Sequence, residues 1–255
     1  MIDSHTHLYF NESFGNDFPG VISRGLEKGV SHFVLPNVDI ASIREMRHFH
    51  DLFPDITSMA IGLHPTEVKE DWRNSIRVLE KELSTGDYKA IGEIGVDLYW
   101  DKGLVRQQLE AFEHQLRMAE EVRFPVIIHS REAFEETIAI INKATPSVPL
   151  IFHSFTGSEK DVKMIREVCD PFFGINGVVT YKNAESLRKS LSEIGIEKIL
   201  LETDSPYLTP VPLRGKRNES SYLDYICNQI GMTLEKTSEE IERITDSNAK
   251  EVFRL

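Results

Sequence analysis

Cysteine is scarce in this sequence, whose 255 residues include only Cys169 and Cys227, far apart and in no C-x-x-C pair. Two distant thiols cannot form a disulfide framework, so the pattern argues against a disulfide-stapled secreted fold and favours a reducing compartment. The segment 1–5 contains neither a basic region nor an apolar one. We therefore expect no secretory signal and predict a cytoplasmic protein.

Long apolar runs and excess positive charge are also missing. No run approaches the roughly 20 apolar residues that span a bilayer, so we predict no membrane partner. The formal net charge is −12, which argues against broad attraction to nucleic acid or anionic lipid, although bound divalent cations can reverse the local field. No repeat, low-complexity tract or charge block marks a linker, and we predict a single domain over residues 1–255.

What the sequence does contain is an alternation of short apolar segments with longer amphipathic ones. The apolar segments 126–128 and 199–201 are typical of strands buried on both faces. The segment 104–122 repeats apolar residues at helical spacing, and Thr237 and Glu240 have the spacing of a capping box. The predicted strands are residues 2–5, 31–36, 57–63, 89–94, 125–129, 150–153, 172–178 and 198–202.

Eight strands alternating with helices over about 250 residues predict an α/β fold, a TIM-type (β/α)8 barrel. A doubly wound open sheet is the competing architecture. The sequence has no G-x-G-x-x-G or G-x-x-x-x-G-K-[ST] phosphate loop to support it. A barrel gathers the C-terminal ends of its strands at one rim, where active sites are built.

Five of the nine histidines fall at or just beyond the predicted strand ends, namely His5, His7, His64, His129 and His153. Residues two apart in extended backbone point to the same side, so the first two could reach one ion. Imidazole nitrogen suits zinc and similar ions. The other four histidines fit a strand start or helices and need no such role.

Two carboxylates join these histidines at the same predicted rim. Glu93 is expected to end the fourth strand between Gly92 and Gly95, which allow close approach, and Asp204 follows the eighth. A carboxylate buried after an apolar run needs a cation or hydrogen-bond donors. A structural ion pair or a helix cap is the alternative for each.

Six side chains are too many for one tetrahedral ion, so we predict two divalent cations about 4 Å apart, bridged by Glu93. One ion is expected on His5, His7, Glu93 and Asp204, the other on Glu93, His129 and His153. Zinc, magnesium and manganese all remain candidates. Four positive charges against two carboxylates favour an anionic phosphodiester over a neutral ester.

The sequence resembles the TatD family of metal-dependent deoxyribonucleases, within the amidohydrolase-like barrels. The likeness spans essentially the whole chain and rests on six blocks in order, which are 3–7, 62–65, 92–97, 128–131, 153–157 and 202–208 followed by 214–219. It implies a TIM-type barrel, divalent metals and hydrolysis of DNA phosphodiesters, often as an exonuclease. The family's ligands correspond to the six positions named above, and its motif histidine to His64.

The hypothesis for the reaction is in-line attack on phosphorus by a hydroxide formed at the metals. Glu93, Asp204 and His64 are the predicted catalytic residues. Asp204 would orient the water or take its proton, and His64 would contact the phosphate or the leaving oxygen. A structural role for His64, bonding backbone beside Pro65, is the alternative.

The predicted substrate contacts are basic side chains near the rim, namely Arg131, Arg214, Lys216 and Arg217. Tyr99 and Trp100 could stack on a base, or pack in the core. DNA, as a single strand or a duplex end, is the expected partner, with no obligate protein partner and a monomeric or weakly oligomeric state.

Two other functions stay open. One is a two-metal amidohydrolase or esterase acting on a small metabolite or on aminoacyl-tRNA. The other is a metal-stabilised scaffold without activity. Its site should be coordinatively closed, whereas this ligand set leaves room for water.

Overall fold

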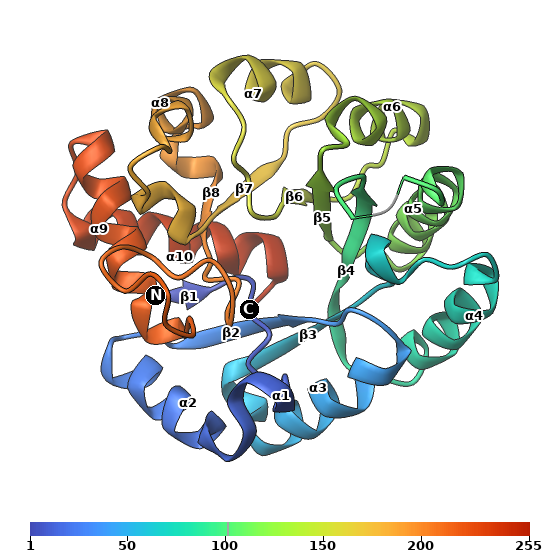
Figure 1. Cartoon of the computed structure of the whole chain (residues 1–255), viewed down its shortest axis with the longest axis horizontal. Helices are drawn as coiled ribbons and strands as arrows, with labels where there is room; N and C mark the ends of the chain where they lie inside the picture. Colours follow the sequence, from blue (N-terminus) through green and yellow to red (C-terminus); the bar gives the residue numbers. More distant parts are fainter. Residues whose placement is uncertain (101) are drawn as a thin grey trace.

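The strands of this protein form a ring enclosed by helices (Figure 1), in a computed structural model that describes residues 1–100 and 102–255. They are β1 (Ile2–Asp3), β2 (His32–Pro36), β3 (Thr57–Ile61), β4 (Tyr88–Asp97), β5 (Val126–Arg131), β6 (Leu150–Phe152), β7 (Phe172–Ile175) and β8 (Ile199–Leu201). Each pairs in parallel with the next along the chain. The predicted TIM-type (β/α)8 barrel is confirmed.

The helices between the strands follow the amphipathic segments. They are α1 (Asn11–Phe14), α2 (Phe18–Glu27), α3 (Ile40–Leu52), α4 (Trp72–Leu83), α5 (Val105–Val122), α6 (Phe134–Ala144), α7 (Glu159–Arg166), α8 (Glu185–Ile194), α9 (Leu223–Leu234) and α10 (Ser238–Phe253). The predicted helix 104–122 is confirmed as α5. Thr237 and Glu240 form the predicted capping box at the start of α10. Across the described residues, we find no helix with the length and apolar character that crossing a membrane requires.

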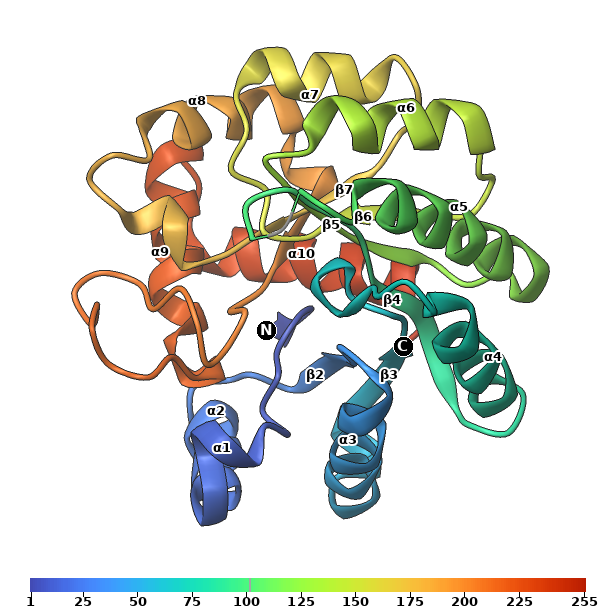
Figure 2. The same cartoon turned by 45° about the vertical axis from the view of Figure 1, so that its right-hand side comes forward.

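The barrel interior is filled by apolar side chains, one from each strand. This cluster comprises Ile2, Val34, Ala60, Ala90, Ile127, Ile151, Phe172 and Leu200, together with Ala249, Val252 and Phe253 of α10. Both views place α10 across one end of the ring (Figure 1, Figure 2). The end of the barrel opposite α10 is therefore open and can hold an active site.

A register shift in β4 corrects one expectation. The strand continues beyond Glu93 to Asp97, so Glu93 lies inside the strand and not at its end. Pairing with β5 shifts between Ile91 and Ile94, and such irregularities re-aim a side chain next to active sites. A Cβ on Gly95 would lie 1.9 Å from the backbone oxygen of His129, so only glycine allows this close approach.

The seam between β1 and β8 is closed by Asp3. Its buried carboxylate accepts hydrogen bonds from the Thr203 backbone nitrogen (2.9 Å), the Thr203 hydroxyl (2.7 Å) and the Ser220 hydroxyl (2.6 Å). Backbone bonds from Ser4 to Leu201 and from Asp204 to His5 continue the seam. The seam between the first and the last strand thereby places His5 and His7 beside Asp204.

Replacing Asp3 with alanine is expected to lower the free energy of unfolding by about 2–4 kcal/mol, because three buried donors lose their acceptor. Urea unfolding followed by circular dichroism measures the change. Asp3→Asn, which keeps one acceptor oxygen, should lose less. A stability loss below about 0.5 kcal/mol in Asp3→Ala, the range of ordinary surface substitutions, would contradict this role for the seam.

Candidate metal centre

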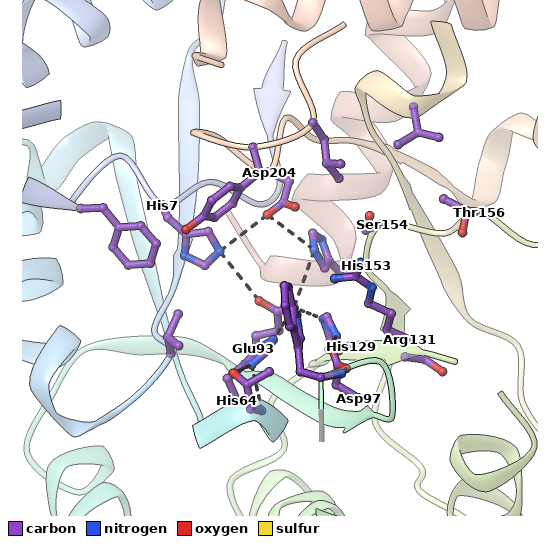
Figure 3. A pocket seen from close by; sticks show the side chains of 18 residues that line it. His7, His64, Glu93, Asp97, His129, Arg131, His153, Ser154, Thr156 and Asp204 are labelled. Carbon is purple, nitrogen blue, oxygen red and sulfur yellow. Dashed lines mark hydrogen bonds and ion pairs between the residues drawn. The ribbon is translucent and has the colours of Figure 1, made fainter. Parts of the chain in front are cut away.

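Most of the predicted metal ligands and catalytic residues line one cavity of about 630 Å³ at the open end of the barrel. Its lining includes His7, His64, Glu93, His129, Arg131, His153 and Asp204. Figure 3 shows the imidazole, carboxylate and guanidinium groups facing a common space. His5 lies fully buried behind them, with its ring stacked 3.4 Å from that of His153. Side chains about two hundred residues apart in sequence therefore meet here.

Three of these side chains, His5, His7 and Glu93, present donor atoms close enough together to share one ion, and Asp204 lies beside the two histidines. The Nε2 atoms of His5 and His7 lie 3.3 Å apart, and they lie 3.2 and 3.8 Å from Glu93 Oε2. Asp204 Oδ1 is 3.8 and 3.7 Å from the same two nitrogens. Ligand bonds of about 2.1 Å give a tetrahedral edge of about 3.4 Å. The donor set and its spacing fit a divalent cation.

The other carboxylate oxygen of Glu93 faces a second histidine group. Glu93 Oε1 lies 2.8 Å from His129 Nδ1, 3.5 Å from His64 Nε2 and 3.7 Å from His153 Nε2. The two oxygens of the Glu93 carboxylate thus face two different groups of imidazole rings. His153 Nε2 is also 3.7 Å from Asp204 Oδ1, so its ring stands between the two groups.

His64 is held in a defined tautomer. The Thr66 backbone N–H donates to His64 Nδ1 at 3.2 Å, which leaves the proton of the neutral ring on Nε2, facing the cavity. Burial lowers the pKa of His64 despite the opposing charge of Glu93, which favours this neutral form. The same side chain therefore caps the turn beside Pro65 and offers a donor to the cavity.

Two carboxylates behind the histidines were not among the predicted site residues. Asp97 Oδ2 lies 3.0 Å from His129 Nε2, and Glu202 Oε1 lies 3.0 Å from His153 Nδ1. Each thus contacts the nitrogen that faces away from Glu93. Carboxylates in this position fix the orientation and raise the basicity of a metal-binding histidine. Both stand in the motif blocks quoted above, but only the ring orientations reveal the contacts.

Asp97→Asn is expected to weaken metal binding at the His129 side about 10- to 100-fold, the usual effect of removing such an outer carboxylate. Isothermal titration of the metal-free protein with Mn²⁺ or Zn²⁺ measures the change. Asp87→Asn, at an exposed carboxylate paired with Lys89, is a matched control. Unchanged affinity in Asp97→Asn would contradict a positioning role.

Without cations, the pKa values of Glu93 and of the histidines around it shift in different directions. Burial would raise the pKa of Glu93, but the histidines around it outweigh burial and hold that pKa well below its usual range. Burial also opposes protonation of His129, yet its hydrogen bonds to Asp97 and Glu93 raise its pKa to about 8. Burial and the neighbouring imidazoles leave His5 with a strongly lowered pKa. His5 is therefore neutral and has a free electron pair, as metal coordination requires.

The predicted substrate contacts fall into three places. Arg131 lines the main cavity. Arg214 and Lys216 line a smaller cavity of about 370 Å³, which shares Leu208 with the first. Arg217 lies in neither lining among the described residues, and its guanidinium pairs with Asp17 and Glu219. Of the basic loop, Arg214 and Lys216 remain available to a substrate, while Arg217 has its charge satisfied within the protein.

Comparison with known proteins gives a consistent result over the full length. Residues 2–254 match the family described as TatD related DNase. YabD of Bacillus subtilis, an uncharacterized metal-dependent hydrolase, is 37% identical over 257 residues, covering 100% of this chain and 99% of YabD. The 3′–5′ ssDNA/RNA exonuclease TatD of Edwardsiella piscicida is 30% identical over 261 residues, covering 100% of both chains.

A solved structure shows the same architecture. The crystal structure of YjjV, a TatD homologue from Escherichia coli, superposes with a TM-score of 0.92 at 23% identity. The match covers 100% of this chain and 98% of the YjjV chain. At this identity the likeness supports the fold and not a particular substrate.

Proposed function

This chain belongs to the TatD related DNase family, whose relatives are named as metal-dependent hydrolases, and we propose that it hydrolyses phosphodiester bonds of DNA from a strand end. The proposed ligands are His5, His7, Glu93, His129, His153 and Asp204, holding two divalent cations. Bound cations of this kind polarise a phosphoryl group and lower the pKa of water. Proton transfer and contact with the substrate phosphates are assigned to side chains of the protein.

The observation that carries the proposal is the division of the Glu93 carboxylate between two histidine groups. Glu93 Oε2 faces His5 and His7, whereas Oε1 faces His129 and His153. A carboxylate in this position would serve both ligand groups, and the cations held there would stabilise charge on a phosphoryl group. The cavity lining also includes Arg131, whose guanidinium suits an anionic substrate better than a neutral one.

Asp204 and His64 have complementary proton-transfer roles in this proposal. Burial raises the pKa of Asp204 to about 7, with the charge of His153 opposing it and that of Glu93 adding to it. A bound cation would favour the charged form, so this carboxylate would be able to accept a proton from the attacking water near neutral pH. His64, with its proton on Nε2, would donate to a phosphoryl or leaving oxygen. Arg131, Arg214 and Lys216 would contact neighbouring phosphates.

The test is a nuclease assay on purified protein of known metal content, with 3′- and 5′-labelled single- and double-stranded oligonucleotides. We expect mononucleotides to be released from one end, and release to stop with EDTA and in His129→Ala. An aminoacyl ester of tRNA is tested in parallel. Hydrolysis of the ester without cleavage of any oligonucleotide would overturn the proposal and support the esterase alternative.

A further inference from the structure

Two aromatic rings stand exposed beside the cavity, immediately after β4. The Trp100 side chain is 69% exposed and Tyr99 is 49% exposed, although both rings are large. Trp100 lines the cavity together with Glu93 and His129. An exposed indole at a cavity wall offers a flat, polarisable face to a ligand. Neither ring packs in the core, which was the alternative to base stacking.

These rings are braced by an arginine from the neighbouring strand. Arg131 Cζ lies 3.8 Å from the centre of the Tyr99 ring and 5.6 Å from that of Trp100. The Tyr99 and Trp100 rings meet edge to face, with centroids 4.9 Å apart. Because the guanidinium covers one face of Tyr99, Trp100 is the ring with more surface left for a ligand.

The position of Trp100 is coupled to the metal centre through one carboxylate. Asp97 Oδ1 accepts hydrogen bonds from the backbone nitrogens of Tyr99 (2.9 Å) and Trp100 (3.2 Å). Asp97 Oδ2 contacts His129 Nε2 at 3.0 Å. The Leu98 backbone nitrogen also donates to the Arg131 carbonyl. The backbone that carries the indole is thereby held at a fixed place relative to the proposed ligand His129.

A third exposed ring approaches the cavity from another part of the barrel. Tyr207, 55% exposed, lines the same cavity, and its backbone nitrogen donates to the Asp204 carbonyl at 2.8 Å. It follows β8, which lies across the ring from β4 (Figure 1). Aromatic surfaces therefore flank the proposed phosphate position from the β4 and β8 sides, and an arginine stands beside one of them.

We propose that Trp100 forms a nucleobase subsite, stacking on the base of the nucleotide whose phosphate lies at the metal centre. This rests on the proposed function, because it places a nucleotide in the cavity. Stacking on an indole is open to every base, since each has a π face, so the subsite confers affinity without sequence preference. Arg131, held against Tyr99, would contact the adjacent phosphate.

The test compares two substrates in the metal-loaded enzyme, an oligothymidylate and the same chain with base-free tetrahydrofuran residues at its ends. Trp100→Ala is expected to raise KM for the oligothymidylate roughly 5- to 150-fold, the range for removing one stacked base. Trp100→Phe should stay close to wild type. On the base-free chain the wild-type KM should rise to that of Trp100→Ala. Met232→Ala, at an exposed apolar side chain on α9, is the control.

A loss in Trp100→Ala that is equal for both substrates, or absent for both, would overturn the subsite. A binding measurement separates this result from failure of the proposed function. The sequence has two tryptophans, Trp72 and Trp100, so in Trp72→Phe the tryptophan fluorescence reports Trp100 alone. In the metal-loaded protein, an oligothymidylate with phosphorothioate linkages, which resist cleavage, should quench it, and the base-free chain should not. Quenching, in an enzyme that cleaves no oligonucleotide, would support the subsite and reject the proposed nuclease activity. Cleavage without quenching would support the nuclease activity and reject the subsite.

Discussion

Glu93→Gln is expected to lower hydrolysis by a factor on the order of 1000 or more, and to reduce the bound metal in the same protein. Glutamine has one acceptor oxygen and no charge, so it cannot serve both histidine groups that now face Oε1 and Oε2. A loss of several kcal/mol of transition-state stabilisation corresponds to a factor of this size. Steady-state rates together with metal analysis measure both effects.

The matched control for this substitution is Glu251→Gln, which makes the same chemical change at an exposed position on α10. It should keep the activity and metal content of the wild type. Far-UV circular dichroism checks that Glu93→Gln remains folded. If Glu93→Gln is folded and still binds two equivalents of metal with unchanged affinity, then Glu93 does not bridge the two ions.

The barrel could be predicted from sequence because its strands are buried on both faces and its helices on one. Segments 126–128 and 199–201 have no polar position, which places them in a parallel sheet covered on both sides. A barrel then brings all C-terminal strand ends to one rim, so His5, His129 and His153 could be placed together without coordinates.

Contacts that depend on register and ring orientation could not be predicted in this way. Glu93 was expected at a strand end, but the shift between Ile91 and Ile94 keeps it inside β4 and aims it inward. Asp97 lies four residues further along the same strand, and nothing in the sequence says which nitrogen of His129 it meets. Arg217 was grouped with its neighbours by charge, whereas its pairing with Asp17 depends on how the loop meets the segment just before α2.

Asp204→Asn is expected to lower kcat about 100- to 10,000-fold, the contribution typical of a positioned general base. Six donor atoms remain among the proposed ligands, namely one nitrogen from each of the four histidines and both oxygens of Glu93, so we expect metal binding to weaken far less than turnover. Asp204 adopts a left-handed backbone conformation with φ of 57°, which asparagine also tolerates. Loss of activity therefore reports the carboxylate and not a change in the turn.

The pH profile gives the sharper test of Asp204. A base must be deprotonated, so kcat should fall as the pH drops below the pKa of this carboxyl group. Burial raises that pKa to about 7 without cations, and a nearby cation favours the charged form, so the acid limb of the loaded enzyme should lie below pH 7. Asp204→Asn should lose this limb, while Asp87→Asn should keep it. A limb unchanged in Asp204→Asn would assign the proton transfer to another group in the cavity.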